Sequence, residues 1–212
     1  MLGVLEMKIK SFTVGLFQTN MYILSNAYNE ALIVDPACKT PAEQQAVSRY
    51  IEQEKLRVCA LIATHGHLDH LWGAAWASEQ FQMPLLIHSN DMPLAEAMQQ
   101  QYDMFGMRAK AQPFPMDNLQ SSVCNLQSKI CNFYLLSTPG HTQGSVCLYW
   151  PDEHLLLSGD TLFCCGYGRT DLPGGNMGQL MQSLDNLFAL PADTRVFPGH
   201  GEATTIGAEK FI

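Results

Sequence analysis

The stretch Thr64-His65-Gly66-His67-Leu68-Asp69-His70 gathers three of the seven histidines of the chain and one carboxylate into a single short segment. It directly follows the apolar run 58–63, which is typical of a strand buried on both faces. Imidazole and carboxylate are the groups that bind zinc or iron near neutral pH. Since α/β sheets place ligands where such strands end, we predict a metal site here.

Three later turns repeat this placement. His141 lies in Thr138-Pro139-Gly140-His141, Asp160 in Ser158-Gly159-Asp160, and His200 in Phe197-Pro198-Gly199-His200, each just after a short apolar run. Five of the seven histidines thus follow apolar strands. This repetition predicts one site at one edge of a sheet.

The order of these motifs resembles that of the metallo-β-lactamase superfamily, over a region from about residue 8 to the C-terminus. Its motifs are a strand-end Asp, a His-x-His-x-Asp-His box, and a later His, Asp and His. The resemblance implies an α/β fold, an αββα four-layer sandwich of two mixed β-sheets with helices on the outer faces. We expect residues 1–212 to form a single domain of this type.

The resemblance also implies a ligand set for two divalent metal ions, with zinc first and iron or manganese as alternatives. The first metal would be held by His65, His67 and His141, the second by Asp69, His70 and His200, and Asp160 would bridge the two. Asp35 would touch no metal but orient the ligand loop; from the sequence alone, an Asp that starts a turn before Pro36 is equally plausible.

Two metals that share a carboxylate commonly share a hydroxide, which can attack an activated acyl group. A thioester suits such a site because its thiolate leaves without strong help from a general acid. Asp69 would then be catalytic as well as a ligand, since it can steer the attacking hydroxide. We therefore expect a metal-dependent hydrolase of a small-molecule thioester.

The segment from Gly159 to Asp171 resembles the glyoxalase II-like branch, where Gly-Asp-Thr-Leu-Phe precedes a Gly-x-Gly-basic segment. There the basic residue contacts the glutathione part of the substrate, which makes Arg169 the candidate here. Asp171 stands where that branch has a tyrosine. Only twelve residues follow His200, so we expect no C-terminal helical domain of the glyoxalase II type.

Other functions remain open. Gly168-Arg169-Thr170-Asp171 also resembles persulfide dioxygenases, in which a single iron would be held by His65, His141 and Asp160. Lactonase or β-lactamase activity would use the same attacking group. A purely structural zinc site is disfavoured, because such sites are usually rich in cysteine.

Composition narrows the class of protein. The formal charge of −8 and the lack of a basic block argue against nucleic-acid binding. No apolar run reaches about 18 residues, so no membrane helix is expected.

The seven cysteines include no Cys-x-x-Cys pair and suggest reduced thiols in a cytoplasmic protein. Cys164 and Cys165 come soon after Asp160, so a place in the lining of the site stays open for them; we favour packing, and the sequence does not decide between the two roles. The sequence leaves the oligomeric state open.

The pattern of apolar residues predicts the secondary structure. We expect strands near 8–14, 20–25, 30–35, 58–63, 84–87, 133–138, 145–150, 154–158 and 194–197. Helices are expected near 41–54, 71–80, 90–104 and 176–188, and residues 107–130 read as irregular. Thr40 and Pro41 fit the N-cap and first turn of their helix.

Overall fold

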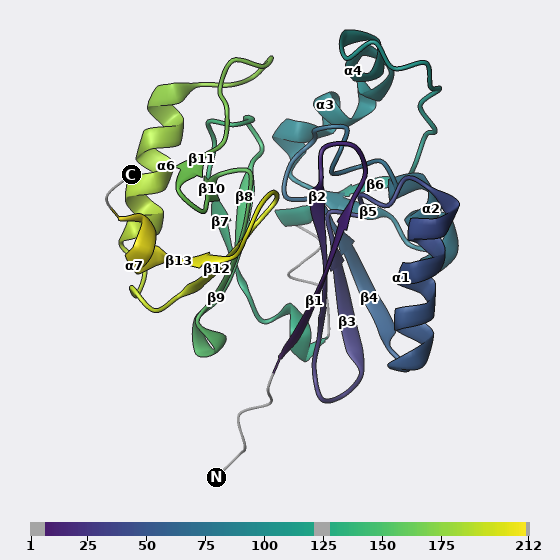
Figure 1. Ribbon diagram of the computed structural model, residues 1–212, viewed down its shortest axis with the longest axis horizontal. Coiled ribbons are helices and arrows are strands. Elements are labelled where there is room, and N and C mark those ends of the chain that lie inside the picture. Colours follow the sequence, from purple (N-terminus) through teal and green to yellow (C-terminus); the bar gives the residue numbers. More distant parts are fainter. Residues whose placement is uncertain (1–6, 121–127, 211–212) are drawn as a thin grey trace.

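Two mixed β-sheets face each other in the computed structural model, which describes residues 7–120 and 128–210 (Figure 1). The first sheet has the order β1 (Lys8–Val14), β2 (Thr19–Ser25), β3 (Glu30–Val34), β4 (Arg57–Ile62), β5 (Leu85–Ile87) and β6 (Met116–Asn118). Strands β1 to β3 are antiparallel, and β3 to β6 run parallel.

The second sheet has the order β13 (Thr204–Thr205), β12 (Arg195–Pro198), β9 (Leu155–Gly159), β8 (Val146–Trp150) and β7 (Tyr134–Ser137). Strands β12 and β9 are parallel, while the other neighbours are antiparallel. A separate hairpin joins β10 (Leu162–Phe163) to β11 (Gly166–Tyr167).

Helices cover the outer faces of both sheets. Helices α1 (Pro41–Gln53) and α2 (Ala74–Phe81) lie outside the first sheet, and α6 (Met177–Phe188) and α7 (Ile206–Glu209) outside the second (Figure 1). The remaining helical segments are η1 (Ser89–Asp91), α3 (Met92–Glu96), α4 (Met98–Met104), η2 (Lys129–Cys131) and η3 (Pro151–Glu153). The four-layer fold predicted from the sequence is confirmed.

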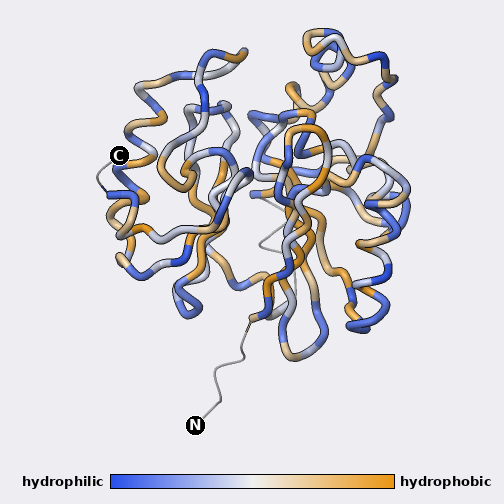
Figure 2. The backbone as a smooth tube through the Cα atoms, viewed as in Figure 1, coloured by the Kyte–Doolittle hydropathy of each residue, from blue (hydrophilic) through white to orange (hydrophobic). Residues whose placement is uncertain are grey.

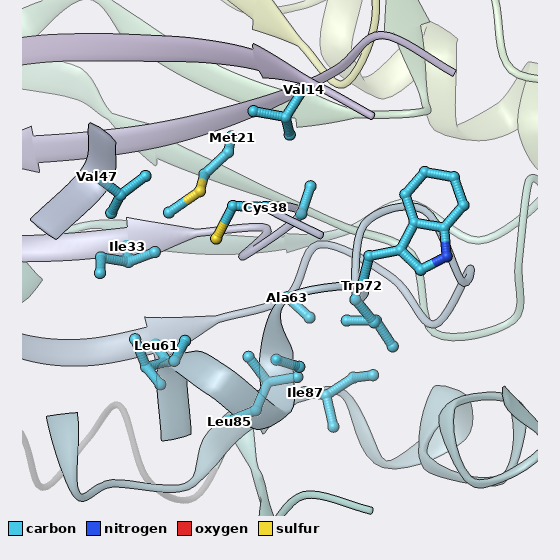
Figure 3. Close-up of a cluster of buried hydrophobic side chains, with 14 of the residues drawn as sticks. Val14, Met21, Ile33, Cys38, Val47, Leu61, Ala63, Trp72, Leu85 and Ile87 are labelled. Carbon is cyan, nitrogen blue, oxygen red and sulfur yellow. The ribbon is translucent and has the colours of Figure 1, made fainter. Parts of the chain in front are cut away.

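Strands with two apolar faces create three hydrophobic layers, because successive strand side chains point to opposite faces. In β2, Met21 and Ile23 join the layer under α1 and α2, part of which is shown in Figure 3, whereas Tyr22 and Leu24 join the layer between the sheets. A third layer packs the second sheet against α6 and includes Leu184. The most apolar segments of the chain accordingly follow the strands (Figure 2).

The start of α1 is fixed by the predicted residues. The Thr40 side chain accepts a hydrogen bond from the Glu43 amide, the Glu43 carboxylate accepts one from the Thr40 amide, and Pro41 occupies the first turn. Glu43 also accepts a hydrogen bond from the Gly15 amide. The same side chain therefore ties the β1–β2 turn to α1.

Several predicted boundaries were wrong. Helix α2 begins at Ala74 rather than at residue 71, because residues 70–73 form the turn that carries His70. The helix expected over 90–104 is broken into η1, α3 and α4. The region 107–130 contains β6, which pairs with β5, and its residues 121–127 lie outside the described chain. Strands β10, β11 and β13 are too short to give a pattern.

Six cysteines lie in the described part of the chain, and all six are free thiols; Cys124 lies outside it. Cys164 and Cys165 are exposed, so their interpretation as packing residues was wrong. Across the residues that the structure describes, no helix combines the length and the apolar character needed to cross a membrane.

Candidate metal centre

The predicted ligands meet at one end of the sandwich, because they follow strands whose carboxyl ends reach that edge. The segment from His65 to His70 follows β4 of the first sheet, while His141, Asp160 and His200 follow β7, β9 and β12 of the second. The site is therefore assembled from both sheets, and neither sheet alone supplies the whole set.

One corner of the site is formed by Asp69, His70 and His200. Nε2 of His70 lies 3.3 Å from Nε2 of His200, and Oδ2 of Asp69 lies 3.6 Å and 3.3 Å from these two nitrogens. Ligand nitrogens that share one tetrahedral zinc, each about 2.0–2.1 Å from it, stand roughly 3.3 Å apart. The three side chains thus already have the mutual spacing of ligands to one metal.

The other corner is formed by His65, His67 and His141. Nδ1 of His67 lies 2.8 Å from Nε2 of His141. The ring of His65 lies 4.9 Å from that of His67 and 4.8 Å from that of His141, measured between centroids. One ring nitrogen from each of the three falls within 4.8 Å of the others.

Asp160 lies between the two corners. Its Oδ2 is 3.5 Å from Nε2 of His141 and 3.4 Å from Nε2 of His200, and its Oδ1 is 3.3 Å from Nε2 of His70. One carboxylate oxygen therefore faces a histidine of each corner, as a bridging ligand would require.

Two buried polar atoms without hydrogen-bond partners indicate whether these residues fit a metal. Nε2 of His65 and Oδ1 of Asp160 are buried without a hydrogen-bond partner. Such atoms normally have one, because an unsatisfied buried polar group is costly. Both atoms belong to the same cluster of imidazoles and carboxylates, so the donor set fits divalent metal ions.

Groups behind the ligands fix their orientation. The Asp35 carboxylate accepts hydrogen bonds from the Thr64 amide and hydroxyl, at 2.7 Å and 2.8 Å, and lies 2.9 Å from Nδ1 of His70. This contact turns Nε2 of His70 toward the cluster. Thr19 donates a 2.8 Å hydrogen bond to Oδ2 of Asp69.

Two backbone carbonyls hold the remaining rings. Nδ1 of His141 lies 2.7 Å from the carbonyl oxygen of Arg169, and Nδ1 of His200 lies 3.0 Å from that of Phe17. In both rings Nε2 is thereby left to face Asp160. The carbonyl of Phe17 comes from the β1–β2 turn, far from His200 in the sequence.

The sequence analysis missed Asp91, which joins two ligand loops. Its buried carboxylate accepts hydrogen bonds from the Gly66 amide, the Thr142 hydroxyl and the Gly144 amide, at 2.8, 2.6 and 2.6 Å. Asp91 precedes Met92-Pro93, where an Asp indicates only a helix start. No spacing signal links it to loops so distant in the chain.

Gln101 of α4 was also missed. Its Oε1 accepts a 2.9 Å hydrogen bond from the Leu68 amide, and its Nε2 donates to the carbonyls of Gly66 and Leu94 at 3.0 Å and 2.8 Å. The loop between His65 and His70 is therefore held by side chains on both of its flanks. A glutamine inside a polar helix gives no sequence signal for such a role.

The histidines of the cluster differ in pKa, so His67 is held neutral and His200 is held charged. Burial, together with the neighbouring His141, lowers the pKa of His67 to about 3. Burial opposes charge on His200 too, but hydrogen bonds to Asp160 and Asp69 outweigh it and raise the pKa of His200 to about 9. For Asp69, burial is outweighed by the charge of His70 and hydrogen bonds from His200 and Thr19, so its pKa falls to about 2.

A pocket of about 230 Å³ opens onto the cluster. The side chains of Phe17, Leu68, Phe105 and Leu172 give it apolar walls, and Gln101, Arg169 and the ligand side chains supply polar groups. Phe17 stacks on Trp72 with 5.5 Å between ring centroids, which fixes one wall. Arg169, the predicted substrate-binding residue, also lines this pocket.

A model of the metallo-beta-lactamase superfamily matches residues 14–200. The chain belongs to this superfamily. Among similar proteins, probable metallo-hydrolase YqgX of Bacillus subtilis (strain 168) is 35% identical over 207 residues, covering 96% of this chain and 95% of its own length. Hydroxyacylglutathione hydrolase GloC of Haemophilus influenzae is 32% identical over 209 residues, covering 96% and 95%.

Solved structures of the superfamily are similar over nearly the whole chain. TTHA1623, whose crystal structure is described as a di-iron-bound form, has a TM-score of 0.83 and 30% identity, over 96% of this chain and all 100% of its own. ETHE1 from Myxococcus xanthus has a TM-score of 0.72 at 24% identity, over 96% and 82%, and this likeness concerns the fold alone.

Proposed function

We propose that the protein is a metal-dependent hydrolase that cleaves a thioester of the S-lactoylglutathione type. The observation that carries this proposal is the complete set of seven imidazole and carboxylate ligands, in two corners joined by Asp160, at the base of an open pocket. Membership of a superfamily that includes metallo-hydrolases supports it.

In this proposal His65, His67 and His141 would hold one divalent ion, Asp69, His70 and His200 would hold another, and Asp160 would supply a carboxylate to both. Bound there, the pair of ions would lower the pKa of a water and polarise the substrate carbonyl. Zinc suits the donor set, and iron is a second candidate because a similar protein carries two irons.

The side chains of the pocket would orient the substrate. Asp69, fixed by the hydroxyl of Thr19, faces the pocket and is placed to accept a proton from, or steer, the attacking water. The apolar walls formed by Phe17 and Phe105 exclude water beside the acyl group. Arg169 at the rim offers a planar guanidinium to a substrate carboxylate.

A relative supports a glutathione thioester as the substrate. The protein named hydroxyacylglutathione hydrolase is covered over 95% of its own length by this chain. The region shared by the two proteins therefore accounts for nearly all of that relative.

The test is steady-state hydrolysis of S-lactoylglutathione by metal-replete protein. Asp69→Ala is expected to lower kcat/KM by about 100-fold or more, because it removes a ligand and a pocket carboxylate together. Asp193→Ala, at an exposed carboxylate that pairs with His154, is the matched control and should leave kcat/KM unchanged.

A wild-type protein that holds two metals and does not turn over this thioester would overturn the proposal. Oxygen consumption with glutathione persulfide, measured on iron-loaded protein, would then identify the alternative dioxygenase. The two activities also differ in metal count, since the dioxygenase requires only His65, His141 and Asp160.

A further inference from the structure

A second group of side chains of the types that bind metals lies outside the centre described above. The exposed residues Cys164 and Cys165 occupy the turn between β10 and β11, and their sulfurs are 3.9 Å apart. Successive side chains of an extended strand point to opposite faces. Cys165 has a φ of 59°, in the left-handed region, and this turn brings the two thiols together.

Glu209 of α7 supplies the third side chain. Its buried carboxylate accepts hydrogen bonds from the Cys165 amide at 2.8 Å and from the Thr204 hydroxyl at 2.6 Å. None of the ion pairs among residues 7–120 and 128–210 involves Glu209. A buried carboxylate without a cation is costly, so the site gains from a bound positive charge.

The three ligand atoms have the spacing of a metal site. Both sulfurs and one Glu209 oxygen lie within 4.8 Å of one another. Two thiolates bound to one tetrahedral zinc, each about 2.3 Å from it, stand roughly 3.8 Å apart. The 3.9 Å between the sulfurs matches this spacing and is far from the S–S bond of about 2.05 Å in a disulfide.

We propose that Cys164, Cys165 and Glu209 bind one thiophilic divalent cation of the zinc and cadmium class. Binding breaks two S–H bonds and forms two sulfur–metal bonds, both protons pass to solvent, and no oxidation state changes. Three protein ligands leave one position open. The cation ties the β10–β11 hairpin to α7, and none of its ligands belongs to the histidine and aspartate cluster.

The hairpin connects this site to the pocket. Phe163, which precedes Cys164, lies with its ring 6.1 Å from that of His200. A cation that fixes the hairpin therefore also fixes a side chain beside a predicted ligand of the main centre. This inference does not depend on the proposed hydrolase activity.

The experiment is a cadmium titration of the full-length protein, kept reduced, with ultraviolet detection of thiolate-to-cadmium charge transfer. The main centre contributes no such absorption because its side chains contain no sulfur. We expect the band to saturate at one equivalent of thiolate-bound cadmium and to vanish in the Cys164→Ser/Cys165→Ser variant. Cys59→Ser, at a half-buried thiol elsewhere, should keep the full band.

Elemental analysis of zinc-loaded, dialysed protein provides a second readout, in which the double variant should hold one equivalent less than the wild type. Glu209→Gln should weaken cadmium binding by tenfold or more while the band remains. The proposal is overturned if the wild type shows no charge-transfer band, or if the band and the zinc content are unchanged in the double variant. The two serine substitutions lie at exposed positions, so the folded protein is expected to persist, as a thermal melt will show.

Discussion

The guanidinium of Arg169 is closed on the carboxylate of Asp171 by two hydrogen bonds of 2.7 Å. Both side chains are largely exposed, and Arg169 is one of the residues that line the pocket. Asp171 thereby occupies the edge of the guanidinium formed by Nε and Nη2. In the proposed function, a substrate carboxylate that used this edge would have to displace Asp171.

Removing this competition should improve binding of an anionic thioester. We expect Asp171→Asn to lower KM for S-lactoylglutathione by no more than about fivefold with little change in kcat, because the pair is exposed and a surface ion pair contributes little. Arg169→Ala should raise KM instead. Steady-state kinetics on both variants checks this, and equal KM values in all three proteins would contradict a substrate contact at Arg169.

The same pair makes a pH prediction. The hydrogen bonds and charge of Arg169 lower the pKa of Asp171 from 3.8 to about 2. A depressed carboxyl pKa gives an interaction that is complete above the unfolded value and is lost as the pH falls through about 2. KM should therefore show no inflection from this pair between about pH 5 and pH 9. An inflection that disappears in Asp171→Asn would contradict the pairing.

Asp91→Ala should destabilise the protein by about 3 kcal/mol or more, because it leaves the amides of Gly66 and Gly144 without their acceptor in a buried place. The ligand loops would also lose their link, so metal affinity should fall. Denaturant unfolding with and without zinc measures both effects. Asp103→Ala, at an exposed carboxylate on α4, is the control and should change the unfolding free energy by less than about 0.5 kcal/mol.

Gly199→Ala should abolish metal binding at the corner that contains His200. A Cβ at this position would meet Oδ1 of Asp160 and would lie 2.7 Å from Cε1 of His70. Gly178→Ala is the matched control, because its Cβ would meet only the Asn176 side chain at 3.4 Å. Elemental analysis measures the zinc content of the two variants. An unchanged zinc content in Gly199→Ala would contradict the prediction, because it would show that the neighbouring side chains can move to accommodate the added methyl group.

Three buried thiols should make the protein sensitive to alkali. Burial raises the pKa of Cys38 and of Cys131 from 9.0 to about 12 and that of Cys147 to about 11. Above pH 9 the unfolded chain loses these protons while the folded protein retains them, so stability falls as the pH rises toward those values. Comparing unfolding free energies at pH 8 and pH 10 tests this. Cys38→Ala should reduce the difference, although it also removes packing.

The clustering of the predicted ligand side chains could be foreseen because each of them follows a short apolar strand in the local sequence. His141 and His200 lie in Pro-Gly turns after apolar strands, and a turn at a strand end is a local feature. The sandwich followed from the same strands. Side chains that act across the fold gave no such signal: Asp91 contacts Gly144, 53 residues away, only because the two sheets meet.

Very short strands and ion pairs between surface side chains could not be predicted from the sequence either. Strands β10 and β11 have two residues each, too few for a period-two pattern, so the turn that exposes Cys164 and Cys165 was invisible. The engagement of Arg169 by Asp171 was equally hidden, because spacing in a loop does not determine which way a side chain folds back.

The hydrogen-bond contact between the Phe17 carbonyl and the His200 ring joins residues 183 positions apart in the sequence. Nearby, the Asn20 side chain donates to the carbonyls of Pro198 and Gly201, so two segments about 180 positions apart in the sequence are joined at one point. During synthesis the corner that contains His200 cannot close until residue 200 has left the ribosome. A chain that terminates before residue 200 would lack a predicted metal ligand, and the β1–β2 turn would lose its partner.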